Sequence, residues 1–105
     1  VTAVESVENA ATPISYSLGE AYPNPFNPET TIEFSVPTDG FVKVDVYNTA
    51  GQLVSSLVDK DLSAGAYKTT WDAMTEDGQQ VSSGVYFYRM EAGDFTDTRS
   101  MTLLK

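Results

Sequence analysis

Alternation of apolar and polar residues along the chain predicts short β-strands rather than helices. The clearest case is Thr30–Val36, whose apolar positions are Ile32, Phe34 and Val36. This period of two is typical of a strand with one buried face. Phe41–Asn48 follows after an Asp39-Gly40 hairpin turn, with one apolar side made by Val42, Val44 and Val46 and the other face made by Lys43, Asp45 and Tyr47. The two segments are therefore predicted to be successive strands.

Further strands follow the same pattern. Ala66–Asp72 is expected to bury one face, made by Tyr67, Thr69 and Trp71. Val85–Met90 is the most apolar run, which favours a central strand, and we expect its core side to be Tyr86, Tyr88 and Met90.

Three segments give weaker signals. Ile14–Leu18 alternates and is predicted as an edge strand, whereas Leu53–Val58 has its apolar residues in adjacent pairs and is followed by a loop at Asp59-Lys60-Asp61. In Phe95–Leu104 no single parity fits. Either a bulge near Arg99 or a strand with one exposed half explains this pattern.

A proline-rich segment, Tyr22–Pro28, precedes these strands. Its prolines, Pro23, Pro25 and Pro28, each fix φ and remove an N–H, so the segment cannot sit inside a sheet or helix. We predict a stiff lead-in whose two aromatic side chains, Tyr22 and Phe26, dock on the domain.

Six or seven short strands at a spacing of about ten residues predict an all-β fold, an antiparallel β-sandwich. Residues 1–13 are small, polar and acidic, and are assigned to a linker or lead-in; residues 14–105 form one domain. The chain starts at Val1 rather than Met, so we expect it to be a piece of a longer protein.

The amino-acid composition argues against some classes of binding partner. The formal charge of -9, from six basic and fifteen acidic residues, argues against nucleic acid and against an anionic membrane surface. No apolar run is long enough to span a bilayer, so the domain is not expected to be membrane-embedded. A monomer is expected.

Catalytic chemistry has little support. The chain has no His and no Cys, which excludes most nucleophilic triads and transition-metal sites. The acidic residues Glu76-Asp77 and Asp59/Asp61 fall in predicted loops, where charges are usually solvated. The EF-hand pattern fails at Ala73 and Thr75, which leaves an irregular calcium site open. We predict no catalytic residue, no metal and no cofactor.

Aromatic residues raise the alternative of a carbohydrate-binding module, because sugars stack on exposed aromatic rings. Trp71 lies among Tyr67 and Thr69 on the predicted inner face, so packing between two sheets is the favoured interpretation.

An ordered set of motifs resembles the type A C-terminal sorting domain of the type IX (Por) secretion system. The motifs are Tyr22–Pro28 with Thr30-Thr31-Ile32, Val46–Gln52, Leu62–Gly65, Trp71-Asp72, Ser83–Arg89 and Met101–Lys105. They span about residues 20–105 in order. Part of the pattern is also similar to the immunoglobulin-like domain of the flagellar hook-capping protein. One departure is Ala73, where many relatives carry glycine after Trp-Asp.

The resemblance implies an immunoglobulin-like sandwich of about seven strands at the C-terminus of an exported protein. The implied function is a non-enzymatic secretion signal that directs a cargo across the outer membrane to the cell surface or medium. Implied partners are the outer-membrane translocon and shuttle proteins of the type IX system, and a sortase-like peptidase. The candidate recognition residues are Tyr22, Pro23, Asn24, Pro25, Phe26, Asn27, Pro28, Met101, Leu103, Leu104 and Lys105.

Two interpretations of the last residues remain open. Met101–Lys105 can act as an edge strand that pairs with a receptor by strand addition, or it can be simply the last core strand. For the domain as a whole, a structural interaction module of a cell-surface protein is the main alternative to an export signal.

Overall fold

Every regular element in the described residues is a β-strand, as the alternating pattern predicts. The computed structural model describes residues 4–6 and 13–105. The strands are β1 (Val4–Ser6), β2 (Ser17–Leu18), β3 (Thr30–Val36), β4 (Gly40–Tyr47), β5 (Leu53–Leu62), β6 (Gly65–Trp71), β7 (Gly84–Ala92) and β8 (Phe95–Leu103). No helix in this part of the chain is long and apolar enough to cross a membrane.

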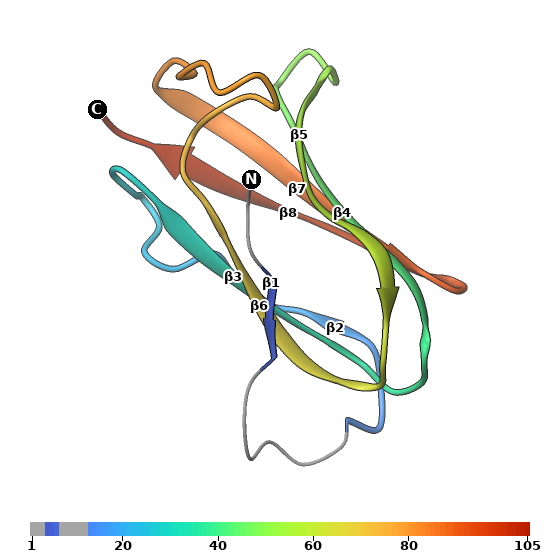
Figure 1. Cartoon of the computed structure of the whole chain (residues 1–105). Helices are drawn as coiled ribbons and strands as arrows, with labels where there is room; N and C mark the ends of the chain where they lie inside the picture. Colours follow the sequence, from blue (N-terminus) through green and yellow to red (C-terminus); the bar gives the residue numbers. More distant parts are fainter. Residues whose placement is uncertain (1–3, 7–12) are drawn as a thin grey trace.

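The strands form two four-stranded sheets packed face to face (Figure 1). The first has the order β1-β6-β3-β2 and the second the order β5-β4-β7-β8. All neighbouring strands are antiparallel. The predicted antiparallel sandwich is therefore confirmed, with eight strands rather than about seven.

The extra strand lies in the region assigned to a lead-in. Val4–Ser6 forms β1 and pairs with β6, with Val4 opposite Thr69 and Ser6 opposite Tyr67. The other residues assigned to the lead-in, apart from Pro13, lie outside the described residues.

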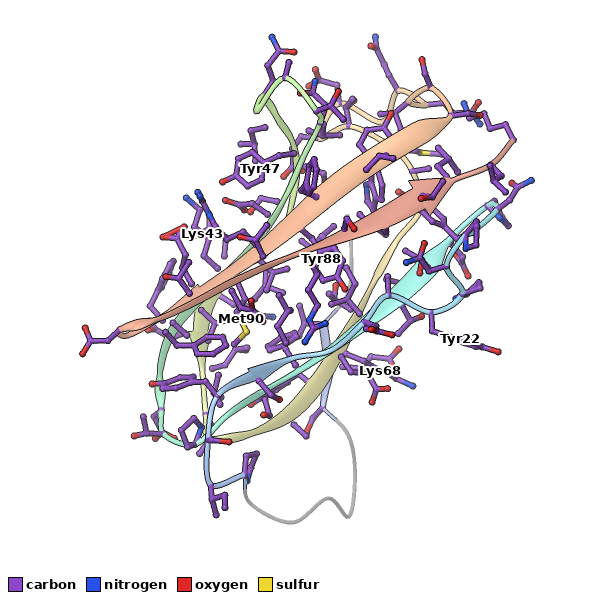
Figure 2. All side chains as sticks on the ribbon, turned by 180° about the vertical axis from the view of Figure 1, so that it is seen from behind. Tyr22, Lys43, Tyr47, Lys68, Tyr88 and Met90 are labelled. Carbon is purple, nitrogen blue, oxygen red and sulfur yellow. The ribbon has the colours of Figure 1, made fainter. Side chains whose placement is uncertain are left out.

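The core consists of the predicted inner faces of the strands. Ile32, Val44, Val46, Trp71, Tyr88 and Met90 are fully buried. Figure 2 shows Tyr88 and Met90 between the two layers. The predictions that β7 is an interior strand and that Tyr86, Tyr88 and Met90 face the core are confirmed.

The predicted loop at Asp59-Lys60-Asp61 is wrong, because β5 continues through these residues to Leu62. Each of the three pairs with a residue of β4. Two register shifts between β4 and β5 explain why the apolar residues of β5 come in adjacent pairs: an extra residue at a bulge lets neighbours such as Leu57 and Val58 both become buried. The charges on β5 follow from its position at a sheet edge.

Phe95–Leu104 contains no bulge. β8 keeps an unbroken register with β7 from Phe95 to Leu103, and its first half is mostly exposed while Met101 and Leu103 are buried. The prediction of a strand with one exposed half is the correct one. The facing edge strand of the other sheet, β2, has only two residues, so much of β8 has nothing to pack against.

Two side chains close the sandwich at this edge. The Tyr88 hydroxyl donates a hydrogen bond to the carbonyl oxygen of Gly19 at 2.7 Å. Arg99 Nε donates to the carbonyl oxygen of Leu18, also at 2.7 Å. Arg99 shares the parity of the buried residues because it reaches across to β2, which explains the mixed pattern in the sequence.

We predict that Tyr88→Phe lowers the free energy of unfolding by about 1–2 kcal/mol, because the partly buried carbonyl of Gly19 loses its partner. The matched control is Tyr67→Phe, whose hydroxyl donates to Ser63 in an exposed setting and should cost below about 0.5 kcal/mol. Urea denaturation measures both. Equal losses would contradict a special role for the Tyr88–Gly19 bond.

Burial raises the pKa of the Tyr88 hydroxyl. The folded state therefore keeps this proton above the unfolded pKa of about 10, and proton loss from the unfolded chain favours unfolding as the pH rises further. We expect stability to fall above about pH 10, and to fall less steeply in Tyr88→Phe. Urea denaturation between about pH 9 and about pH 11 tests this, and parallel profiles for the two proteins would refute it.

Candidate recognition surface

The proline-rich segment Tyr22–Pro28 lies outside the strands. Its three X–Pro peptide bonds are cis. It is tied to the start of β3: Tyr22 and Thr31 exchange two backbone hydrogen bonds of 2.9 Å, and Thr30 Oγ1 donates to the carbonyl oxygen of Pro23 at 2.8 Å. The segment is thus fixed by contacts along its length rather than by pairing within a sheet.

The two aromatic residues of the segment behave differently. Phe26 is buried, but the Tyr22 side chain is 80% exposed and points away from the domain (Figure 2). The prediction that both dock is correct for Phe26 and wrong for Tyr22. The other five residues, Pro23, Asn24, Pro25, Asn27 and Pro28, are also exposed.

Phe26 joins an aromatic cluster in the core. Its ring lies 5.7 Å from that of Trp71, and Trp71 in turn meets Tyr86 edge-on at 5.1 Å. Trp71 Nε1 donates to the carbonyl oxygen of Met74 at 3.0 Å, so the polar atom of the buried indole is satisfied. The interpretation of Trp71 as a core residue rather than a sugar-stacking platform is confirmed, since none of it is exposed.

The last residues of the chain divide in the same way. Met101 and Leu103 are buried, whereas Leu104 is 55% exposed and Lys105 is exposed. The backbone N–H of Lys105 donates to Ser83 Oγ at 3.1 Å. A partner can therefore touch Leu104 and Lys105 but not Met101 or Leu103 in the folded domain.

The structure brings the two predicted recognition segments together. Phe26 N–H donates to the carbonyl oxygen of Thr102 at 2.9 Å, and Leu104 N–H donates to that of Phe26 at 3.0 Å. The side chain of Asn24 accepts a hydrogen bond from Thr102 N–H at 3.0 Å. In Figure 1 the chain's last residues accordingly lie at the end of the molecule where β3 begins.

This pairing changes the interpretation of the last strand. The N–H and carbonyl oxygen of Thr102 and the N–H of Leu104 are already used by Asn24 and Phe26, so they are not available to another strand. The prolines on either side of Phe26 have no N–H and cannot extend the edge themselves. The proline segment therefore caps the end of β8 against strand addition.

A pocket of about 190 Å³ opens where the segments meet, lined by Asn27, Pro28, Asp72, Ala73, Gln80, Leu103 and Lys105. Ala73 has a φ of 61°, the left-handed conformation that costs a residue with a Cβ about 1–2 kcal/mol. Its carbonyl oxygen still accepts the N–H of Val81 at 3.0 Å. The turn thus forms with alanine at the position where glycine is expected.

We define the recognition surface as the exposed residues of the two segments, Tyr22, Pro23, Asn24, Pro25, Asn27, Pro28, Leu104 and Lys105. Asn24, Ser83 and Thr30 hold the surface in place through side-chain hydrogen bonds to the backbone. Asn24 lies between Pro23 and Pro25, which have no backbone N–H for its side chain to accept locally. This position indicates that the side chain bonds to a more distant part of the chain. Nothing in the sequence singles out Ser83 for this purpose.

The acidic side chains weighed for catalysis have structural or solvent-facing positions. Glu76 accepts a hydrogen bond from the backbone N–H of Ser56 at 2.6 Å, and Asp59 and Asp61 are exposed on β5. Across residues 4–6 and 13–105, no three acidic side chains gather closely enough to hold a metal ion.

The profile of the FlgD Ig-like domain family matches residues 27–94, which is more than half of the chain. The chain belongs to this family. The immunoglobulin-like architecture expected from the sequence is thereby confirmed. Both the first part of the proline segment and the residues of β8 lie outside the matched range.

Two solved structures from Porphyromonas gingivalis are similar to the chain. One is PorZ, described as an essential surface component of the type IX secretion system, with a TM-score of 0.56 and 20% identity over 86% of this chain and 11% of PorZ. The other is dimeric latent PorU, with a TM-score of 0.67 and 20% identity over 93% of this chain and 10% of PorU.

The chain thus spans about a tenth of the length of each. At this identity the likeness shows a shared fold. No curated protein sequence matches the chain.

We predict that Phe26→Ala lowers the free energy of unfolding by about 3–5 kcal/mol, as expected when a buried aromatic residue is removed. It should also increase amide hydrogen exchange at Thr102 and Leu104, because both are held by the proline segment. The control is Phe41→Ala, at a side chain that is 52% exposed and should cost below about 1 kcal/mol. Unchanged exchange at Leu104 would contradict the coupling.

Proposed function

We propose that the domain is a folded, non-enzymatic export signal of the type IX secretion system, recognised at the surface formed by Tyr22–Pro28 and the last residues of the chain. The observation that carries the proposal is the pairing of Phe26 with Thr102 and Leu104. It joins the first and last of the motifs that resemble the sorting domain. A signal that is recognised in the folded state requires a surface whose residues are held in fixed positions on a rigid domain.

Two further observations support the proposal. PorZ, which contains a domain of this fold, is described as a surface component of the same secretion system. The recognition surface is made mostly of residues outside the family match at residues 27–94, so membership of the family does not by itself account for it.

In this proposal the cargo protein lies on the N-terminal side of the domain, and the cargo is delivered to the cell surface or outside the cell. The partners would be the translocon and shuttle proteins of the system. A sortase-like peptidase would remove the domain or exchange it for an anchor. Because the formal charge is -9, the receptor is expected to carry the complementary basic residues.

Export of a reporter tests the proposal. Residues 1–105 are fused behind a periplasmic reporter in a host with a type IX system, and the reporter is measured in the medium, on the surface and in the periplasm. We expect export with the parent domain. The double variant Tyr22→Ser, Leu104→Ser should reduce export by roughly tenfold or more, because two exposed contact residues are lost.

The matched control is Phe41→Ser, Leu53→Ser, which alters two exposed apolar residues away from the recognition surface. Point substitutions are preferred to deleting the last residues, because Leu103 is buried and its loss would damage the fold. Periplasmic retention of the folded parent fusion would refute the export function. Equal export of the two double variants would show that the recognition surface is not the site of recognition, and would leave the proposed export function itself standing.

A structural interaction module is the second candidate, favoured by one observation. Leu53, Val85 and Phe87 are exposed by 57%, 42% and 37%. Leu53 and Phe87 are both paired with Tyr47, so they lie on the outer face of the second sheet. Sedimentation tests this candidate: association that Phe87→Ser abolishes would support it, and a monomer at all concentrations would count against it.

A further inference from the structure

Among the described residues, no segment pairs with the outer backbone edge of the first half of β8. β8 is the last strand in the order β5-β4-β7-β8, so β7 covers only one of its edges. The backbone groups of Thr102 point away from β7, because they bond to Phe26 and Asn24. By the two-residue period of an antiparallel strand, those of Thr96, Thr98 and Ser100 point the same way, since the register with β7 has no shift.

The protection of this edge is uneven. The proline segment covers it at Thr102 and Leu104, but within the described ranges no segment pairs with β8 between Thr96 and Ser100. In this stretch Thr98 N–H donates to Asp97 Oδ1 at 3.0 Å, a short-range contact that an incoming strand can replace. Thr96, Thr98 and Ser100 are exposed.

A groove of about 530 Å³ runs beside the open edge, lined by Glu20, Asn24, Phe87, Tyr88, Thr98, Arg99 and Ser100. Arg99 is held by the carbonyl oxygen of Leu18, with Glu20 at 3.9 Å and Asp97 at 3.8 Å from its guanidinium. The Glu20 side chain is 86% exposed. Glu20 lines the groove and Asp97 lies beside Arg99 outside its lining. These three side chains together carry one net negative charge, and the whole domain is acidic.

We propose that the edge of β8 from Thr96 to Ser100 binds an extended, basic segment of a partner protein by strand addition. The backbone groups of Thr96, Thr98 and Ser100 would hydrogen-bond to the added strand, while Glu20 and Asp97 attract its basic side chains. Asn24 and Phe26, which bond to Thr102 and Leu104, set where the added strand must end. This inference concerns the isolated domain and does not rest on its role in export.

The test uses a synthetic nine-residue peptide of alternating threonine and lysine, titrated at low salt into isotope-labelled domain and followed by backbone NMR. We expect chemical-shift changes concentrated at Thr96–Ser100 and Glu20, with a Kd of roughly 0.1–1 mM. The same peptide with alternate amides N-methylated should bind at least about tenfold more weakly, because it cannot form the ladder.

Binding that survives N-methylation would show attraction by charge alone and would overturn the proposal. So would shift changes that concentrate on β5, the other edge of the same sheet. Because both readouts use the unaltered protein, they do not depend on any variant folding correctly.

Matched charge-reversal variants test whether the acidic side chains beside the β8 edge attract the basic peptide. Glu20→Lys should weaken binding by about fivefold, the effect of exchanging attraction for repulsion at an exposed site. Asp61→Lys makes the same charge change on exposed β5 and should weaken binding by less than about twofold. Equal effects would indicate non-specific attraction. Ser100→Pro removes one outward N–H and should abolish shift changes along the edge while the rest of the spectrum is retained.

Discussion

The docking of Phe26 is the interaction on which the arrangement of this domain depends. Its ring contacts Trp71 in the core, while its backbone exchanges hydrogen bonds with Thr102 and Leu104. One residue therefore connects the proline segment, the core and the last strand. Without it, buried Leu103 would lie at an uncovered edge. The exposed residues on either side of Phe26 owe their fixed positions to this one buried neighbour.

A second set of contacts holds the same edge of the sandwich further along. Tyr88 and Arg99 donate to the carbonyl oxygens of Gly19 and Leu18, and Phe95 stacks on Tyr16 at 5.4 Å. The strand β2 is too short to hold itself by ladder hydrogen bonds alone, so side chains of β7 and β8 supply what is missing. The domain has no cysteine, and these side-chain contacts take the place that disulfides occupy in other small sandwiches.

The sequence predicted those parts of the fold in which one face is buried and the other is solvated. β3 and β7 follow the period of two, and β4 departs from it at Asp45, which is buried although it shares a face with Lys43 and Tyr47. Prediction failed where a strand is paired but has little to pack against: polar Asp59–Asp61 extend β5 because β4 supplies hydrogen bonds, and a strand of three residues, β1, carries no periodic signal.

The recognition segments were identified from motifs, but their contact was not. A bridge between Phe26 and Leu103 leaves no pattern in the sequence.

The division between core and edge explains how one sandwich can acquire a specific role. Residues 27–94 match a family of immunoglobulin-like domains, and they contain most of the packed core. The recognition surface and the edge formed by β2 and β8 lie mostly outside that range. A fold by itself does not determine function. Here Asn24 and Phe26 close one end of the edge, while no other described segment pairs with it from Thr96 to Ser100. Such an edge restricts a partner strand in length and register, and this is how an exposed edge can give specific binding rather than aggregation.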